Sequence, residues 1–366
     1  MTGIRYSVAI AEESTFGEGA GSNKFYTLSA GAYMSATANI STETVFSPGS
    51  KFFDTAIYGR LSGSFEIDFV LSYEYLGLFK LVFEDYKTET ILGEDGITPT
   101  GLYKHTFSKA NNKRIGSFII RRKTLNSITG PTSGLDEATE FRGCVIKSLR
   151  ISQSSGSSKL SVTVSGYFKE PITDLKALSE TDFEEFEGQP VEWACALFDD
   201  KYVKTVESLT LSVDNGANMM YTTCRDTSIN YYEDKSSFQF GMTTYSNDFT
   251  RVKGRALSGG QDASNAASGT KYKNMCKNKK PLKSVKMLSF NTCAEGSDGV
   301  LAAYNAASLS VMFNIEDCIV KSATWQKGDG SRMLDQISSA ECKKISMVVV
   351  NDIESYATPP TDHQIS

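Results

Sequence analysis

Histidine is scarce in this chain, and that limits the chemistry its side chains could perform. The 366 residues include two histidines, His105 and His363. Triads of the Ser-His-Asp kind use a histidine as their base, and catalytic zinc sites commonly use two or three histidine ligands. His105 falls in a predicted strand, where a structural role is the usual one, and His363 lies close to the C-terminus. We therefore expect neither a histidine-based active site nor a metal centre.

Two carboxylates, Glu66 and Asp68, are the best remaining candidates for acid–base chemistry. They are two residues apart in an alternating segment, so on a strand they would share one face, as paired catalytic carboxylates do. Exposure of the polar side of a strand explains them equally well. Residues 17–21 (GEGAG) resemble half of a dinucleotide fingerprint, but no long buried strand precedes them and no GxGxxG pattern is completed. We predict that the chain is not an enzyme and uses no cofactor.

Seven lysines between Lys271 and Lys286 form the one strongly basic segment. Such a cluster can hold phosphates, but a single-strand binding platform interleaves aromatic residues and arginines, and here only Tyr272 is present. A solvated loop, or a loop paired with the acidic residues 174–200, explains the cluster as well. The formal net charge of −5 argues against tight nucleic-acid binding.

The composition is that of a globular protein, with 40% hydrophobic and 22% charged residues. No apolar run approaches the roughly 20 residues that cross a bilayer, so we expect no membrane insertion. The first twenty residues lack the apolar core of an export signal. Seven cysteines without a close CxxC pair do not suggest a disulfide framework, and reduced thiols in a cytoplasm are the expectation.

The hydrophobic pattern predicts a mainly β protein. Residues 64–69 alternate strictly, which places Phe65, Ile67 and Phe69 on a buried face. The other predicted strands cover residues 34–40, 104–108, 117–122, 145–152, 160–167, 209–213, 238–242, 287–290, 308–313, 319–325 and 344–350, with a hairpin turn at 154–157. Apolar residues at helical spacing predict one helix over 73–86, capped by Ser72, and a second helix is expected near 247–257.

Part of the sequence occurs twice. The segment CVIKS at 144–148 returns as CIVKS at 318–322, an offset of 174 residues. At an offset of 173, Ala36, Ala38 and Ile40 correspond to Leu209, Leu211 and Val213, and Phe65, Ile67 and Phe69 correspond to Phe238, Phe240 and Met242. Residues 159–164 resemble 344–349, with extra residues placed in a hairpin loop around 328–337. This periodicity predicts two copies of one module. In the second copy, Gln239 and Gly241 replace Glu66 and Asp68.

The length also suits two domains, because single cores rarely grow beyond about 250–300 residues. We predict a first module over 1–172, an acidic linker over 173–190, a second module over 191–356 and a C-terminal tail over 357–366. Residues 174–200 carry nine carboxylates against a single lysine.

Each predicted module contains a long segment rich in large side chains. Residues 41–62 are predicted as a loop between two strands, and residues 214–236 are its counterpart. Long loops in compact domains are usually functional, and aromatic residues on them are common interface anchors, although a local cap over the core is the alternative. The predicted contact residues are Phe46, Phe52, Phe53, Tyr58, Met219, Met220, Tyr221, Tyr231 and Tyr232.

The chain contains ESTFG at 13–17, GSFE at 63–66 followed by YLGL at 75–78, and FRGCVIKSL at 141–149 running into a Gly-Ser hairpin and residues 160–166. These segments resemble the major tail tube proteins of tailed bacteriophages. The first module carries the resemblance best. In the second, VESLTL at 206–211 followed by DNG at 214–216 fits, whereas the Phe-rich entry and the helix glycine are missing.

The resemblance implies a tube-type β-sandwich or barrel module with a flanking helix. Strands of neighbouring subunits would join around a lumen, and rings would stack into a tail assembled in the cytoplasm of the bacterial host. Other tail proteins would be partners, and double-stranded DNA would pass without specific binding. Glu66 and Asp68 are then expected to line the lumen. Rings of this family present six modules, so three chains would close a pseudo-sixfold ring. Six chains are the alternative, with the second module as outer decoration.

A different class of protein also fits the composition. A two-domain β-sandwich adhesin or carbohydrate-binding protein would use the seventeen tyrosines equally well. Such a protein would remain a small particle, whereas a tube protein would polymerise.

Overall fold

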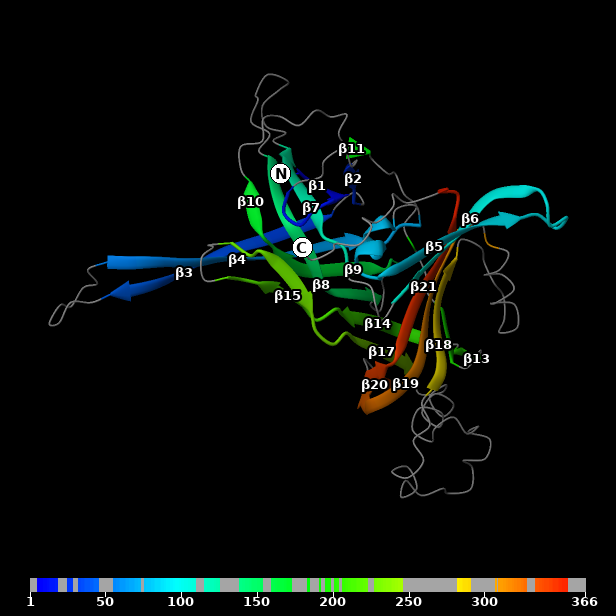
Figure 1. Cartoon of the computed structure of the whole chain (residues 1–366). Coiled ribbons are helices and arrows are strands. Elements are labelled where there is room, and N and C mark those ends of the chain that lie inside the picture. Colours follow the sequence, from blue (N-terminus) through cyan, green and yellow to red (C-terminus); the bar gives the residue numbers. More distant parts are fainter. Residues whose placement is uncertain are drawn as a thin grey trace.

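The structure is a computed structural model of the whole chain. It describes residues 5–18, 25–28, 32–45, 55–73, 76–109, 115–125, 138–153, 159–172, 183–184, 191, 195–198, 201–203, 206–222, 227–245, 282–290, 307, 309–327 and 333–354. These residues are mostly in strands (Figure 1), which confirms the predicted mainly β fold.

In the N-terminal half the strands are β1 (Arg5–Glu12), β2 (Phe25–Thr27), β3 (Tyr33–Val45), β4 (Thr55–Val70), β5 (Asp85–Leu92), β6 (Pro99–Ser108), β7 (Phe118–Leu125), β8 (Ala138–Gln153), β9 (Ser161–Phe168) and β10 (Glu170–Ile172). The C-terminal half contains β11 (Phe183–Glu184), β12 (Cys195–Phe198), β13 (Lys201–Val203), β14 (Val206–Asp214), β15 (Ala217–Met220), β16 (Asn230–Glu233), β17 (Ser237–Tyr245), β18 (Leu282–Phe290), β19 (Ser310–Lys327), β20 (Met333–Cys342) and β21 (Lys344–Asn351). Each predicted strand overlaps one of these.

Eight strands form one continuous layer, which we call the central sheet. Their order is β3-β4-β9-β8-β14-β17-β20-β19, and every neighbouring pair is antiparallel. The first four strands come from the N-terminal half of the chain and the last four from the C-terminal half. The two groups meet where β14 pairs with β8. A single sheet therefore runs across both halves.

Two covering sheets pack against one face of the central sheet. Their strand orders are β2-β1-β7-β8-β10 and β13-β12-β18-β19-β21-β6-β5. The core lies between the layers, where Phe65 of β4 meets Phe118 of β7 edge to face at a centroid distance of 5.9 Å. One cluster of buried apolar residues contains members from both halves. The segments predicted as two domains therefore share a sheet and a core.

Alternation decides which side of each central strand faces the core. In β4, Phe65 and Ile67 are buried while Glu66 and Asp68 are exposed, as the sequence predicts. Strand β9 alternates in the same way, and it pairs antiparallel with β8, as the predicted hairpin requires.

The long strands β8 and β19 bend where they leave a covering sheet and enter the central sheet. Gly143 has a φ of 61° at the first bend, and Asp317 has a φ of 53° at the second. Both angles lie in the left-handed region, which glycine adopts easily and aspartate only at some cost. The segments 308–313 and 319–325, predicted as separate strands, are thus two parts of one bent strand.

The hydrogen bonds beside the two bends also correspond. The N–H of Lys169 donates to the C=O of Arg142 (2.9 Å), and the N–H of Lys343 donates to the C=O of Glu316 (3.2 Å). Each residue of the second bond follows its counterpart by 174 positions.

Glu13 holds the first bend from inside the protein. Its carboxylate accepts the N–H of Gly143 (2.8 Å) and the N–H of Gly17 (3.1 Å). Burial raises the pKa of Glu13 to about 7, although these donors and the charge of Lys169 act in the opposite direction. Because the folded state keeps this proton to a higher pH than the unfolded chain, its contribution to stability declines as the pH rises from about 4.5 to 7.

The pairing registers relate the two groups of central strands. Val145 lies opposite Tyr167 and Ile319 opposite Glu341, an offset of 174 on both strands. Ala36 lies opposite Phe65, and the equivalent pair is Leu211 with Phe240, an offset of 175. The predicted offset of 173 for β3 and β4 is therefore wrong by two residues. It assigned the correct face because side chains alternate with a period of two.

One predicted strand match is also wrong. Residues 344–349 form β21, which pairs with the N-terminal half of β19 in a covering sheet, as β10 does with β8. The strand in the place of β9 is β20, between β17 and β19. It begins at Met333, inside the stretch expected to be a loop. Similar alternation in β9 and β21 produced the false match, because alternation does not say which strand is the neighbour.

The prediction of one helix over 73–86 is also wrong. Among the described residues of this range, the helical element is a five-residue 3-10 helix, η1 (Gly77–Leu81), and Asp85 already starts β5. No side chain caps its start. Phe79 and Phe83 are buried as the apolar stripe predicts, but Tyr86 pairs across strands with Phe107. The helix expected near 247–257 and the tail 357–366 lie outside the described residues.

We predict that Gly143→Ala destabilises the chain by about 1–3 kcal/mol. The added Cβ would sit at a positive φ and 2.7 Å from Cβ of Lys169. Asp317→Gly at the matched bend is expected to leave stability unchanged or to raise it slightly. Urea unfolding of both variants measures this, and an equal loss in the two would contradict the account of the bends.

Candidate assembly surfaces

The face of the central sheet turned away from the core is polar and poor in charge. Side chains on it that are at least partly exposed include Ser35, Thr37, Ser64, Glu66, Asp68, Arg150, Ser152, Thr163, Ser165, Thr210, Ser212, Asp214 and Gln239. Lys147 lies beside Tyr167, and at the equivalent place Lys321 forms an ion pair with Glu341. The described charged side chains of this face include four carboxylates and four cations, which are Glu66, Asp68, Asp214, Glu341, Arg60, Lys147, Arg150 and Lys321.

Glu66 and Asp68 lie on this outer face, as the alternation predicts. Both are exposed. Oδ1 of Asp68 accepts a hydrogen bond from the hydroxyl of Thr163 on the neighbouring strand (2.6 Å). They are two members of a broad hydroxyl-rich surface.

The central sheet ends in two open edges, β3 and the C-terminal half of β19. Among the described strands, β3 pairs only with β4, and this part of β19 pairs only with β20. Ala38 and Ile40 stand on the core side of β3, yet Ala38 is exposed and Ile40 is 55% exposed. Their equivalents, Val213 of β14 and Asn215 just beyond its end, are fully buried because β8 lies alongside them. The core is thus left open along β3, where a neighbouring strand is missing. At the other open edge, Ile319 of β19 lies on the outer face, opposite Glu341, and is 45% exposed.

The segment predicted as a loop over 41–62 is largely a two-stranded arm. Strand β3 continues to Val45 and β4 starts at Thr55, so Tyr58 lies in a strand opposite Thr42. The arm projects far beyond the rest of the sheet (Figure 1). Alternating Thr residues let it pair where a loop was expected. Phe46, Phe52 and Phe53 lie outside the described residues.

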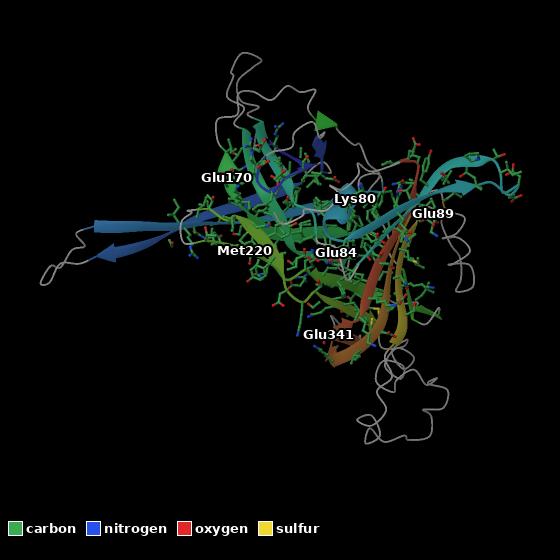
Figure 2. All side chains as sticks on the ribbon, viewed as in Figure 1. Lys80, Glu84, Glu89, Glu170, Met220 and Glu341 are labelled. Carbon is green, nitrogen blue, oxygen red and sulfur yellow. The ribbon has the colours of Figure 1, made fainter. Side chains whose placement is uncertain are left out.

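The counterpart over 214–236 contains the hairpin of β15 and β16. Met220 is exposed on it (Figure 2). Tyr232 is also exposed, and Met219 is partly buried. Tyr221 is partly buried, with the guanidinium of Arg60 5.6 Å from its ring centroid.

The prediction that Tyr231 is a contact residue is corrected by its burial, because its side chain is only 2% exposed. It packs with Val145 and Ile115, and its hydroxyl donates a hydrogen bond to the C=O of Ile115. Phe16 lies 5.5 Å from its ring. Tyr231 therefore anchors the hairpin to its own chain and is unavailable as a contact residue.

The hairpin of β5 and β6 is a surface that the sequence did not single out. Strand β6 from the N-terminal half pairs with β21 from the C-terminal half, and the hairpin tip carries the exposed residues Leu92 and Ile97. His105 of β6 is buried at this joint, where its Nε2 lies 3.0 Å from Oδ1 of Asn351. Burial lowers the pKa of His105. Which strand a hairpin will join is not encoded in its own pattern, so no sequence signal was available.

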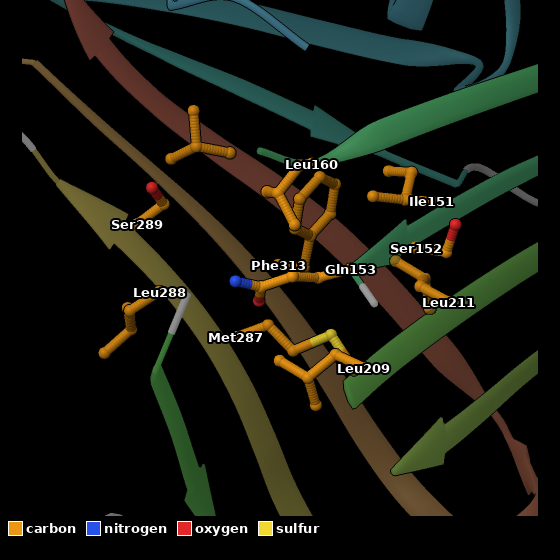
Figure 3. A pocket seen from close by; sticks show the side chains of 11 residues that line it. Ile151, Ser152, Gln153, Leu160, Leu209, Leu211, Met287, Leu288, Ser289 and Phe313 are labelled. Atoms are coloured by element: carbon orange, nitrogen blue, oxygen red, sulfur yellow. The ribbon is translucent and has the colours of Figure 1, made fainter. Parts of the chain in front are cut away.

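A small cavity lies between the central sheet and the second covering sheet. Its lining includes Leu209 and Leu211 of β14 with Met287 of β18 and Phe313 of β19 (Figure 3). A volume of about 10 Å³ corresponds to roughly one water molecule, far below the several hundred Å³ of a ligand pocket.

A family model described as phage tail tube protein matches residues 3–252, more than half of the chain. The chain belongs to the phage tail tube protein family. No curated protein matches it. The match extends from the first strand to just beyond β17, so it spans the seam between β8 and β14.

Membership of the tail tube family makes this chain a structural component of a phage tail, and a non-enzymatic role follows from the family. Within the part of the chain that the structure describes, no helix is long and apolar enough to cross a membrane. The side chains of Cys144, Cys318 and Cys342 are buried.

Adjacent tyrosines on β16 offer a direct test of this assignment of surfaces. Tyr231→Ala should lower the free energy of unfolding by about 3–5 kcal/mol, because it empties a buried aromatic site. Tyr232→Ala should change it by less than about 0.5 kcal/mol. Thermal and chemical denaturation measure both, and a large loss for Tyr232→Ala alone would reverse the assignment.

Proposed function

We propose that this tail tube protein assembles into stacked rings whose bore conducts DNA during ejection. The observation that carries the proposal is the central sheet, which has two open edges and one hydroxyl-rich face. Unpaired strand edges are a liability in a monomer, and closure into a ring removes them. Family membership supports the same function.

We further propose that the chain is a duplicated tube module, with copies over 1–172 and 191–356 and a linker over 173–190. The equivalent strand orders in the central sheet support this, as do the matching bends at Gly143 and Asp317. The covering sheets add a third correspondence, since β2-β1-β7-β8-β10 and β13-β12-β18-β19-β21 follow one plan.

A duplicated module implies three chains in each ring. Both copies contribute four strands to one uninterrupted sheet, so three chains would supply a ring of six modules with pseudo-sixfold symmetry. Six chains with the second copy as outer decoration is the alternative. The continuity of the central sheet favours three, because the second copy extends the layer instead of lying outside it.

The outer face of the central sheet is the proposed lining of the bore, with Glu66 and Asp68 on it. Duplex DNA carries one negative charge per about 1.7 Å, so a lysine-lined bore would hold it by releasing counterions. A hydroxyl surface with balanced charges lets it pass. Lys286 stands on β18 in a covering sheet, which keeps it away from this face. Most of the lysine cluster over 271–286 lies outside the described residues.

Projecting elements are the proposed contacts between rings. The arm of β3 and β4 extends beyond the sheet, with Tyr58 in its strand and Phe46, Phe52 and Phe53 in the segment that connects them. Exposed Met220 and Tyr232, together with Met219 and Tyr221, form the matching contact set on the second copy. Other tail proteins would meet the ends of the stack, and assembly would take place in the cytoplasm of the bacterial host.

Negative-stain microscopy of the purified chain tests the proposal. We expect tubes or rings, and end-on averages with threefold symmetry together with a ring mass of three chains. Compact particles alone would favour an adhesin or carbohydrate-binding protein. Six chains in each ring would disprove the threefold arrangement while leaving the tube intact.

Charge reversal tests the lining of the bore. The double variant Glu66→Lys and Asp68→Lys should still form tubes, because both side chains are exposed in the monomer, but it should slow DNA release from assembled virions. Glu89→Lys and Glu94→Lys on the β5–β6 hairpin are the matched control, since they add the same charge away from the central sheet. Normal release from the first variant would exclude Glu66 and Asp68 as lining residues.

A further inference from the structure

The seam between β8 and β14 contains a complete strand junction between the two copies. Leu209 lies opposite Gln153, and the register continues through Ser212 opposite Arg150. One residue beyond the end of β14, the N–H of Asn215 donates a hydrogen bond to the C=O of Lys147, which lies opposite it (2.8 Å). In an antiparallel pair of strands, opposite residues alternate between hydrogen-bonded pairs and more closely spaced pairs without hydrogen bonds. Because Asn215 and Lys147 form a hydrogen-bonded pair, Ser212 and Arg150 form one of the closely spaced pairs without hydrogen bonds.

The two strands at the open edges of the central sheet are equivalent to the two strands that meet at this seam. Strand β3 is equivalent to β14, because Ala36 and Phe65 pair as Leu211 and Phe240 do. The C-terminal half of β19 is equivalent to that of β8, which follows from the shared bend and the shared pairing with β20 and β9. One edge is therefore the partner that the other edge lacks.

Exposed core-side residues on β3 indicate that this edge lacks a neighbouring strand. Ala38 and Ile40 point to the core side but are exposed, whereas Val213 and Asn215 are buried beneath the seam. A strand added along β3 would cover the first two as β8 covers the second two. Burying the side chain of Ile40 would also remove apolar surface from water.

The residue offsets transfer the register of the seam to the open edges. Positions in β3 precede those in β14 by 175, and positions in β19 follow those in β8 by 174. The seam pair Ser212–Arg150 then becomes Thr37–Thr324, and its neighbours become Asn39–Ser322 and Ser35–Gln326. Both members of the Thr37–Thr324 pair belong to described strands.

We propose that β3 of one chain pairs antiparallel with the C-terminal half of β19 of a second copy, in the register that sets Thr37 opposite Thr324. The proposal rests on the proposed function, since it requires chains that associate side by side. It adds the partner strand and the residue register of the contact. The chain thus contains, in its own β8–β14 seam, the pattern for its contact with the next chain.

Cysteine pairs in the assembled protein test this register. Thr37→Cys with Thr324→Cys should form disulfides between chains under mild oxidation, because a closely spaced antiparallel pair has a Cα separation suited to the bond. Thr37→Cys with Ser322→Cys, on the same face but slipped by two residues, should bridge at least about tenfold less. Ser212→Cys with Arg150→Cys should bridge within one chain, and wild-type protein reports any bridging by the native cysteines.

The outcomes separate failure of the register from failure of the function. Tubes that bridge through the slipped pair, or that do not bridge through Thr37→Cys and Thr324→Cys while the control within the chain does, overturn the register alone. No ring or tube from wild-type protein overturns the proposed function and the register together. If a reduced double variant does not assemble, amide exchange in wild-type protein decides. Slower exchange at Ala36 and Ala38 on assembly supports pairing along β3 with Thr37 in a pair without hydrogen bonds, and unchanged exchange overturns the proposal.

Discussion

The hydrogen bonds between β8 and β14 are the constraint on which the rest of the structure depends. They join two four-stranded groups into the central sheet and cover two strand edges whose N–H and C=O groups would otherwise be unpaired. Without them, each half would end in two open edges. With them, the central sheet keeps two open edges among the described strands, β3 and the C-terminal half of β19.

The bends in β8 and β19 follow from that constraint. Each strand must pair in a covering sheet along its first half and in the central sheet along its second, so its direction changes at one residue. Buried polar groups gather around the first bend. Glu13 accepts hydrogen bonds there, and Glu140, also buried, pairs with Arg121 (2.7 Å) and Arg142 (2.6 Å). Replacing one partner of a buried ion pair destabilises the fold, because the other charge is then left buried and unpaired.

Two hairpins then tie the halves together outside the central sheet. The β5–β6 hairpin extends the second covering sheet through β21, and Tyr231 fixes the β15–β16 hairpin to Ile115 of the first half. Chain segments far apart in sequence complete each other's layers. The halves are therefore expected to unfold as one cooperative unit, even though each resembles a domain in its strand plan.

The sequence by itself determined the mainly β fold, most central strands, the core face of β4 and the family of the chain. Phe65 and Ile67 were assigned to the core and Glu66 and Asp68 to the outer face, because alternation depends only on the local backbone period. Only the tertiary structure decided that residues 73–86 form a short 3-10 helix before a strand, that 41–45 and 55–62 pair as an arm, that β20 takes the place of β9, and that Tyr231 is buried while Tyr232 is exposed. It also revealed the open edges at Ile40 and Ile319. The physical reason is that periodicity records how often a side chain meets the core, whereas the neighbour of a strand is chosen by contacts between residues far apart in the chain.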